Sequence, residues 1–175
     1  MHRLSVDEFK AASKLPLVVV LDNVRSLHNV GSVLRSCDAF RVEAVYLCGI
    51  TATPPSAEIH KTALGAEDSV TWKYFAQTTD AINELHAKGT KVFAVEQVAG
   101  STMLQNLDTE VGTRYAVVLG NEVKGVQQTV VDLCDGCLEI PQFGTKHSLN
   151  VSVAAGIVVW EFAKKIGKSE EVKLR

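Results

Sequence analysis

Three short segments of the 175-residue chain carry polar side chains whose types and spacing could do chemistry. Asn29 and Arg35 lie in the first segment, Glu122 in the second, and Ser148 and Asn150 in the third. Glycine or other small residues lie close to each of them in the sequence. Together they offer amides, a guanidinium, a carboxylate and a hydroxyl, a set that suits a compact pocket for a polar ligand.

The same residues also have simpler interpretations. Arg35 could be a surface arginine that pairs with Asp38, which follows it on the next turn of a helix. Ser148 could be the N-cap of a closing helix, and Asn29 also occupies a position where an N-cap would lie. The residues alone leave these alternatives open.

Several other kinds of catalytic or metal site are absent from the sequence. The chain has no GxGxxG dinucleotide fingerprint, no phosphate-binding loop of the GxxxxGK type and no GxSxG nucleophile elbow. Cys134 and Cys137 have the spacing of a zinc or redox pair, but Cys37 and Cys48 do not form the second pair that a zinc site needs. We therefore predict a turn between two half-buried thiols and no metal.

Strands and helices that alternate along the chain must position these segments. Continuous β-branched runs are typical of strands buried on both faces, whereas apolar residues three and four apart indicate amphipathic helices. The expected strands are 15–21, 44–50, 70–75 (at an exposed edge), 91–95, 115–119 and 137–140, and the expected helices are 29–40, 56–64, 80–87, 127–133 and 148–165. This alternation predicts a single α/β domain with a mostly parallel sheet flanked by helices. Ligands bind beyond the carboxyl ends of such strands, so the loops to search follow Leu21, Val95, Leu119 and Ile140.

Composition limits the class of protein and its partners. With 46% hydrophobic and 22% charged residues, the chain is close to the globular average, which excludes disorder. Its net charge of −2 argues against a broad basic surface for nucleic acid, but the acidic surplus is confined to residues 51–112, where eight acidic residues outnumber four basic ones. The chain has no apolar run of the roughly 18 residues that a membrane span needs and no apolar signal-peptide core at its N-terminus. We expect a soluble, cytoplasmic protein with no membrane contact.

The three polar segments resemble the motifs of a known enzyme family. Leu27–Arg35, Val118–Gly125 and Ile140–Ala154 are similar, in order and spacing, to the three motifs of the SpoU-type RNA 2′-O-ribose methyltransferases of the SPOUT superfamily. The resemblance covers about residues 17–166 and implies a SPOUT fold whose C-terminal part forms a deep trefoil knot. It also implies a homodimer that binds S-adenosylmethionine and transfers its methyl group to a ribose 2′-hydroxyl of tRNA or rRNA. The small size of the chain resembles that of stand-alone tRNA enzymes, so tRNA is the preferred substrate.

The resemblance also assigns roles to individual residues. It puts catalytic functions on Arg35, Asn29, Glu122, Ser148 and Asn150, and it puts the cofactor against Val95, Leu119, Gly120, Ile140 and Leu149, largely through backbone groups. Because a guanidinium does not readily give up its proton, our hypothesis is that Arg35 stabilises the developing alkoxide or binds the adjacent phosphate. Ser148 and Asn150 would then orient the ribose.

The ends of the chain differ from many family members, which carry an extra N-terminal RNA-binding domain or basic extensions. Residues 1–16 form a short extension with room for one short helix anchored by Val6 and Phe9, residues 17–166 form the methyltransferase domain, and residues 167–175 form a charged, frayed tail. Recognition of RNA would then fall to the catalytic domain and its dimer partner. The candidate RNA contacts on the motif loops are Arg25, His28, Arg41, Lys124, Lys146 and His147.

Two other functions remain as alternatives. The chain could be a knotted RNA-binding or assembly module without catalysis, although it retains all five residues at the catalytic positions. It could also methylate a base or a small molecule rather than a ribose, which the missing RNA-binding domain would suit.

Overall fold

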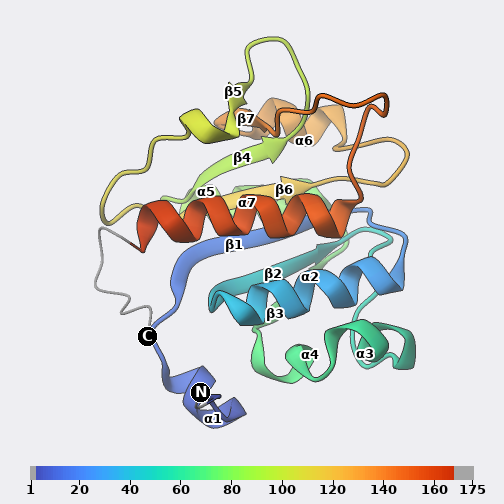
Figure 1. Ribbon diagram of the computed structural model, residues 1–175, viewed down its shortest axis with the longest axis vertical. Helices are drawn as coiled ribbons and strands as arrows, with labels where there is room; N and C mark the ends of the chain where they lie inside the picture. Colours follow the sequence, from blue (N-terminus) through green and yellow to red (C-terminus); the bar gives the residue numbers. More distant parts are fainter. Residues whose placement is uncertain (1–2, 168–175) are drawn as a thin grey trace.

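Runs of β-branched and other apolar residues form a seven-stranded parallel sheet in the computed structural model, which describes residues 3–167 (Figure 1). The strand order is β3-β2-β1-β6-β4-β7-β5. The central strands β1 and β6 are almost wholly buried, as their uninterrupted apolar sequences predict. The strands are β1 Leu15–Asp22, β2 Val42–Cys48, β3 Trp72–Phe75, β4 Lys91–Val95, β5 Thr102–Met103, β6 Tyr115–Leu119 and β7 Gly136–Glu139.

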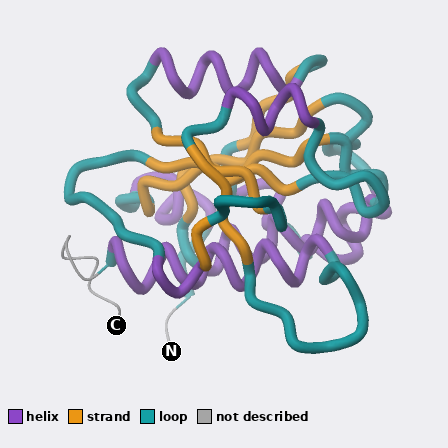
Figure 2. The backbone as a smooth tube through the Cα atoms, turned by 90° about the horizontal axis from the view of Figure 1, so that it is seen from above, coloured by secondary structure: helices purple, strands orange, loops and turns teal. Residues whose placement is uncertain are grey.

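Helices cover both faces of this sheet, as Figure 2 shows from above. On one face α2 and α7 lie side by side over β1 and β2, with α3 and α4 packed on the outside of α2 (Figure 1). On the other face α5 and α6 bury their apolar residues against β4 and its neighbours. The helices are α1 Val6–Ala11, α2 Leu27–Ala39, α3 Ala57–Ala63, α4 Ala66–Ser69, α5 Thr78–Ala87, α6 Gln128–Leu133 and α7 Val151–Ile166, with a short 3-10 helix at Leu104–Asn106. The predicted α/β class with a parallel sheet is confirmed.

Glycine lets α2 and α3 pack very closely. A Cβ atom placed on Gly31 would lie 2.1 Å from Thr62 Oγ1 and 2.3 Å from the carbonyl oxygen of Ile59. Any larger residue at Gly31 would push α3 away from α2. Because α2 carries Asn29 and Arg35, this contact helps to fix the helix on which both residues stand.

The two helices that follow motif loops begin at residues other than those expected, and the starts of the other expected helices differ by one or two residues. In α2 the hydroxyl of Ser26 accepts a hydrogen bond from the backbone N–H of Asn29, so Ser26 is the N-cap and Asn29 lies in the first turn. In α7 the N-cap is Asn150, whose side chain accepts from the N–H groups of Ser152 and Val153. Ser148 therefore lies outside the helix, because Asn150 caps as well as serine does and directly precedes the first buried residue of α7.

The N-terminal segment forms the single short helix that was expected, α1. Ser5 and Glu8 cap each other's backbone at its start, and Phe9 is buried against the core. Val6 is 42% exposed, so only Phe9 anchors the helix. The predicted tail at 167–175 lies outside the described residues except for Gly167, and the trefoil knot stays a prediction. No helix in the described part of the chain is long and apolar enough to cross a membrane.

Candidate functional site

A pocket of about 320 Å³ lies at the carboxyl edge of the sheet, where the loops after β4, β6 and β7 meet the start of α7. A cavity of this volume lies within the range of small-molecule sites. One side is apolar, and the other is formed by the polar loop after β6. The residues of the apolar side are Val95, Leu119, Leu138, Ile140, Leu149, Val151 and Ala154.

The structure brings all five residues expected at the cofactor into the lining of this pocket. Val95 ends β4, Leu119 and Gly120 end β6 and begin its loop, and Ile140 and Leu149 lie at the two ends of the loop that leads to α7. Although these residues are up to 54 positions apart in the sequence, they meet because parallel strands end at the same edge of the sheet.

The loop over residues 120–127 is a tight turn that requires glycine at two positions. Asn121 and Gly125 exchange two backbone hydrogen bonds of 3.0 and 2.9 Å, which close the turn. A Cβ atom on Gly120 would lie 2.1 Å from the carbonyl carbon of Gly125, and Gly125 itself has a φ of +69°. The side chain of Asn121 supports the turn from inside by accepting from the N–H groups of Val123 and Lys124.

Two carboxylates, at the ends of the strands on either side of β6, hold this loop in place. Asp22, fully buried at the end of β1, accepts from the backbone N–H of Gln127 at 2.9 Å and from its side-chain amide at 2.7 Å. Glu96, the residue after β4, accepts from the N–H of Val126 at 2.6 Å. Neither residue was predicted as part of the site, although each lies at the end of a strand whose following loop was expected to bind a ligand.

The carboxylate of Glu122 joins the loop after β6 to the loop after β1. It accepts from the backbone N–H groups of Arg25 and Ser26, each at 3.0 Å, and from the side-chain amide of Asn29 at 3.3 Å. Partial burial raises the pKa of this carboxyl, but these hydrogen bonds outweigh the burial, so the pKa lies below its ordinary value. Glu122 is therefore ionised at neutral pH and well suited to hold the start of α2.

A chain of hydrogen bonds connects the three motif segments. Glu122 accepts from Asn29 Nδ2, and Asn29 Oδ1 in turn accepts from Asn150 Nδ2 at 3.2 Å. Asn150 at the same time caps α7. Three of the five predicted catalytic residues, distant in the sequence, are thus in direct contact, and their amides and carboxylate orient one another.

The other two predicted catalytic residues are exposed. Ser148 lies in the lining of the pocket, on the loop before α7. Arg35 lies on the exposed side of α2 and does not line the pocket; within residues 3–167 no hydrogen bond or ion pair engages its side chain. The alternative pairing with Asp38 does not occur, because Asp38 accepts from the hydroxyl of Ser69 instead.

Five of the six basic candidates lie near the pocket or at the start of α2. Lys124 and His147 line the pocket, and Lys146 is exposed beside His147. Arg25 is exposed and gives its backbone N–H to Glu122.

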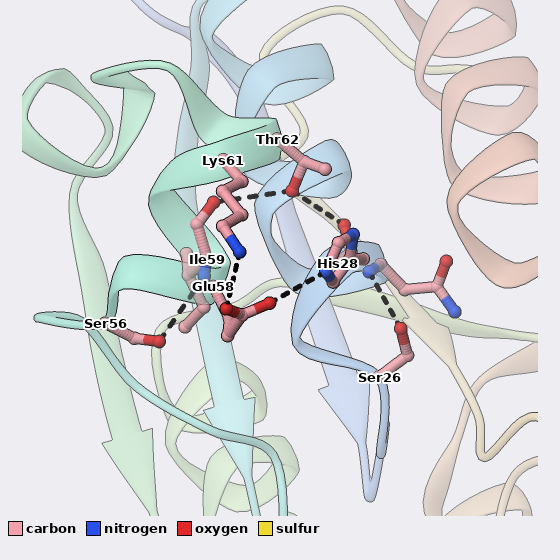
Figure 3. A network of polar contacts seen from close by, with 8 residues as sticks. Ser26, His28, Ser56, Glu58, Ile59, Lys61 and Thr62 are labelled. Atoms are coloured by element: carbon pink, nitrogen blue, oxygen red, sulfur yellow. Dashed lines mark hydrogen bonds and ion pairs between the residues drawn. The ribbon is translucent and has the colours of Figure 1, made fainter.

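His28 is turned away from the pocket toward α3. Its Nε2 lies 3.0 Å from a carboxylate oxygen of Glu58, which also accepts from Lys61 at 2.8 Å (Figure 3). The backbone carbonyl of His28 accepts from the hydroxyl of Thr62. The observed contacts of His28 therefore connect α2 to α3.

Arg41 does not lie with the other candidates. It follows the C-terminal end of α2, and its carbonyl oxygen accepts from the N–H of Leu15 at the start of β1. The 13 residues of α2 carry the chain about 20 Å toward the opposite edge of the sheet. Closeness to the first motif in sequence was therefore misleading for Arg41.

The cysteine pair takes no part in the pocket. Cys134 and Cys137 are free and partly buried, on either side of a bend at Asp135. Burial raises the pKa of Cys134 to about 12 and also raises the pKa of Cys137, so both are protonated thiols at neutral pH. In the part of the chain that the structure describes, no group of three or more His, Cys, Asp or Glu side chains could hold a metal ion.

Comparison with known proteins gives consistent matches. The sequence profile described as the SpoU rRNA methylase family matches residues 16–160. The chain is 36% identical over 156 residues to the 23S rRNA (guanosine-2′-O-)-methyltransferase RlmB of Nitrosomonas europaea, covering 89% of this chain and 58% of that protein. It is 31% identical over 165 residues to the RlmB of Vibrio cholerae, covering 94% and 66%. The chain thus spans about three fifths of the length of these curated relatives.

Solved structures agree with the sequence matches. The TrmH/SpoU tRNA modifying enzyme of A. aeolicus superposes with a TM-score of 0.78 at 27% identity, over 90% of this chain and 78% of that one. The AdoMet-bound rRNA methyltransferase of Sinorhizobium meliloti superposes with a TM-score of 0.79 at 29% identity, over 87% of this chain and 60% of that one.

Proposed function

The chain belongs to the SpoU rRNA methylase family, and from that premise we propose that it is an S-adenosylmethionine-dependent methyltransferase acting on a ribose 2′-hydroxyl of RNA. One observation carries the proposal: the hydrogen-bond chain from Glu122 through Asn29 to Asn150 joins the three motif segments beside a pocket that the second and third segments line. A module without catalysis has no chemical need for this arrangement.

The pocket fits S-adenosylmethionine in size and in chemistry. Its volume of about 320 Å³ and its apolar wall suit an adenosyl group, and the glycines at 120 and 125 bring backbone groups close to the space. Glu96 and Gln97 add polar side chains to the lining. When bound, the cofactor supplies a methyl group activated by a positively charged sulfur.

Arg35 is proposed to act on the RNA rather than on the cofactor. A guanidinium stays protonated in proteins, so Arg35 cannot serve as the base that takes the ribose proton. Its side chain is exposed, and within the described residues nothing engages it, so it can bind the phosphate beside the target ribose or stabilise the developing alkoxide.

Of the remaining motif residues, one is proposed to contact the substrate, and the others hold the motif segments in position. The amide oxygen of Asn150 caps α7 and its nitrogen donates to Asn29, so Asn150 is largely occupied in joining two segments. We therefore assign Ser148, which lies in the pocket lining, to orienting the ribose, and Asn29, Glu122 and Asn150 to positioning.

The class of RNA is chosen from the relatives. The curated relatives are 23S rRNA enzymes by name, whereas the A. aeolicus relative, matched over more of its own length, is a tRNA modifying enzyme. We take rRNA as the first substrate to test and tRNA, which the sequence favoured, as the second. Either substrate supports a cytoplasmic location.

The decisive experiment incubates the protein with labelled S-adenosylmethionine and separately with purified rRNA and tRNA, followed by digestion to nucleosides. We expect label in 2′-O-methylated nucleosides of one RNA class. Label in a methylated base would point to a non-ribose target, and cofactor binding without transfer to any RNA would point to the inactive module.

Arg35→Ala and Arg41→Ala form a matched pair for this assay. Arg35 lies in the second half of α2 and Arg41 directly follows the C-terminal end of that helix, but only Arg35 is proposed to contact the RNA. We expect Arg35→Ala to lower kcat about a hundredfold or more and Arg41→Ala to leave it unchanged. A rate profile against pH for Arg35→Lys tests the electrostatic role. An active lysine variant with a new inflection at lower pH would show that Arg35 acts as a base instead.

The exposed side of α7 supports a homodimer. Val153, Ile157 and Trp160 are 51%, 38% and 47% exposed, and their spacing of four and three residues places them on one side of the helix. A second copy would cover this row in a two-fold interface, the commonest symmetry of soluble oligomers. Ile157→Glu should shift the mass measured by light scattering from dimer to monomer, whereas Val111→Glu, at a residue 73% exposed elsewhere, should not.

A further inference from the structure

Glu96 is held in a fixed orientation in the wall of the pocket. Its backbone N–H donates to the carbonyl of Leu138 on β7 at 3.0 Å, and its Oε1 accepts from the N–H of Val126 at 2.6 Å. The carboxylate also packs directly against Gly125, where a Cβ atom would lie 2.2 Å from Oε1. The backbone of Glu96 is therefore anchored on β7 and its side chain on the loop over residues 120–127.

The second carboxylate oxygen of Glu96 is free. Within residues 3–167 no hydrogen bond or ion pair engages Oε2, and this oxygen is not among the fully buried polar atoms that lack a partner. Lys124 and His147 line the same pocket but make no ion pair with it. A carboxylate group with one anchored and one accessible oxygen is a preorganised acceptor for a ligand that carries hydrogen-bond donors.

We propose that Glu96 binds the ribose diol of the cofactor through this free oxygen. The inference rests on the proposed function and adds a specificity-determining residue to it. Vicinal hydroxyls offer two donors to one carboxylate, and an acidic residue close to the end of a strand recognises ribose hydroxyls in other α/β nucleotide sites. The apolar wall around Leu138 and Ile140 is left for the adenine ring.

Glu96→Gln isolates the free oxygen from the anchored one. The glutamine keeps an amide oxygen for the N–H of Val126, so the loop stays held, but the charge and one acceptor are lost. Glu110→Gln is the matched control, because Glu110 is an exposed carboxylate that pairs with Lys91 away from the pocket. Thermal melting of both variants verifies that they are folded.

Titration calorimetry with S-adenosylhomocysteine, which lacks the sulfonium charge, measures the contribution of Glu96 to the binding affinity for the ligand. We expect Glu96→Gln to bind about tenfold more weakly than wild type, and Glu110→Gln to bind as wild type does. A 2′,3′-dideoxy analogue should weaken binding to wild type but cause little further loss in Glu96→Gln, because the partner of the diol is already removed.

Three results would overturn the inference and are distinguishable. Equal affinity of wild type and Glu96→Gln for S-adenosylhomocysteine would show that Glu96 makes no ligand contact. A loss seen only with S-adenosylmethionine would show that the carboxylate faces the sulfonium and not the ribose. If wild type bound neither compound, the proposed function itself would fail together with this inference.

Discussion

The loop over residues 120–127 and the loop over residues 141–149 border the same pocket, yet they are held very differently. The first makes hydrogen bonds to Asp22, Asn23, Glu96 and the start of α2. The second makes none: in the described part of the chain no hydrogen bond or ion pair involves residues 141–149, and Phe143 is 96% exposed. One wall of the pocket is thus fixed by folding, whereas the other presents unengaged polar groups.

This difference separates two tasks within one site. Folding orders the 120–127 loop, so its backbone groups and Glu122 are in place before any ligand arrives. The 141–149 loop keeps Ser148 and the basic Lys146 and His147 free to bind a substrate, at the cost of ordering them on binding. Substitutions in the first region should therefore affect stability, and substitutions in the second should affect activity.

Among the substitutions that compare the two loops, Asp22→Ala should cause the largest loss in the free energy of unfolding. Its buried carboxylate accepts from the hydroxyl of Thr78 and from two groups of Gln127, and all of these donors would lose their partner. We expect the free energy of unfolding, measured with denaturant, to fall by about 3 kcal/mol. Phe143→Ala in the other loop should change it by less than about 0.5 kcal/mol. Similar losses for the two variants would show that both loops are held equally.

Ser148→Ala should show the opposite behaviour. Since the hydroxyl has no partner in the described structure, its loss should leave the free energy of unfolding unchanged. If it orients the ribose, kcat/KM for RNA should fall about tenfold. Thr145→Ala, which removes an exposed hydroxyl from the same loop, is the control and should keep wild-type kinetics. A stability loss without a kinetic loss would place Ser148 with the fixed wall instead.

Much of the fold could be predicted because its signals are local. The β-branched runs that form β1 and β6 were placed within a residue of their observed bounds, and β3 was correctly expected at an edge. The two-residue β5 and the short 3-10 helix after it were missed, because elements this short have no periodicity to detect.

The site was only partly predictable because its hydrogen bonds join residues that are far apart in the sequence. Glu122 and the amide of Arg25 are 97 residues apart, and Asp22 and Gln127 are 105 apart, so no sequence spacing shows that they meet. Motif resemblance located the pocket lining, but it did not reveal that Asn150 is occupied as a helix cap. It also could not reveal that α2 carries Arg41 away from the site.

The smallest expected effect concerns pH and the carboxylate of Glu122. Hydrogen bonds from the start of α2 hold its pKa in the folded protein below the ordinary glutamate value of about 4.3. A group whose pKa is lowered by folding stabilises the protein above its unfolded pKa, and this contribution is lost as pH falls through the folded pKa. Wild type should therefore be more stable than Glu122→Gln near pH 6, and the difference should shrink below about pH 4. Denaturant unfolding across pH 3–6 measures it, with Glu110→Gln expected to follow wild type. A difference that is constant with pH would mean that ionisation of Glu122 does not help to hold α2, and that the charge of Glu122 serves the substrate rather than the fixed wall.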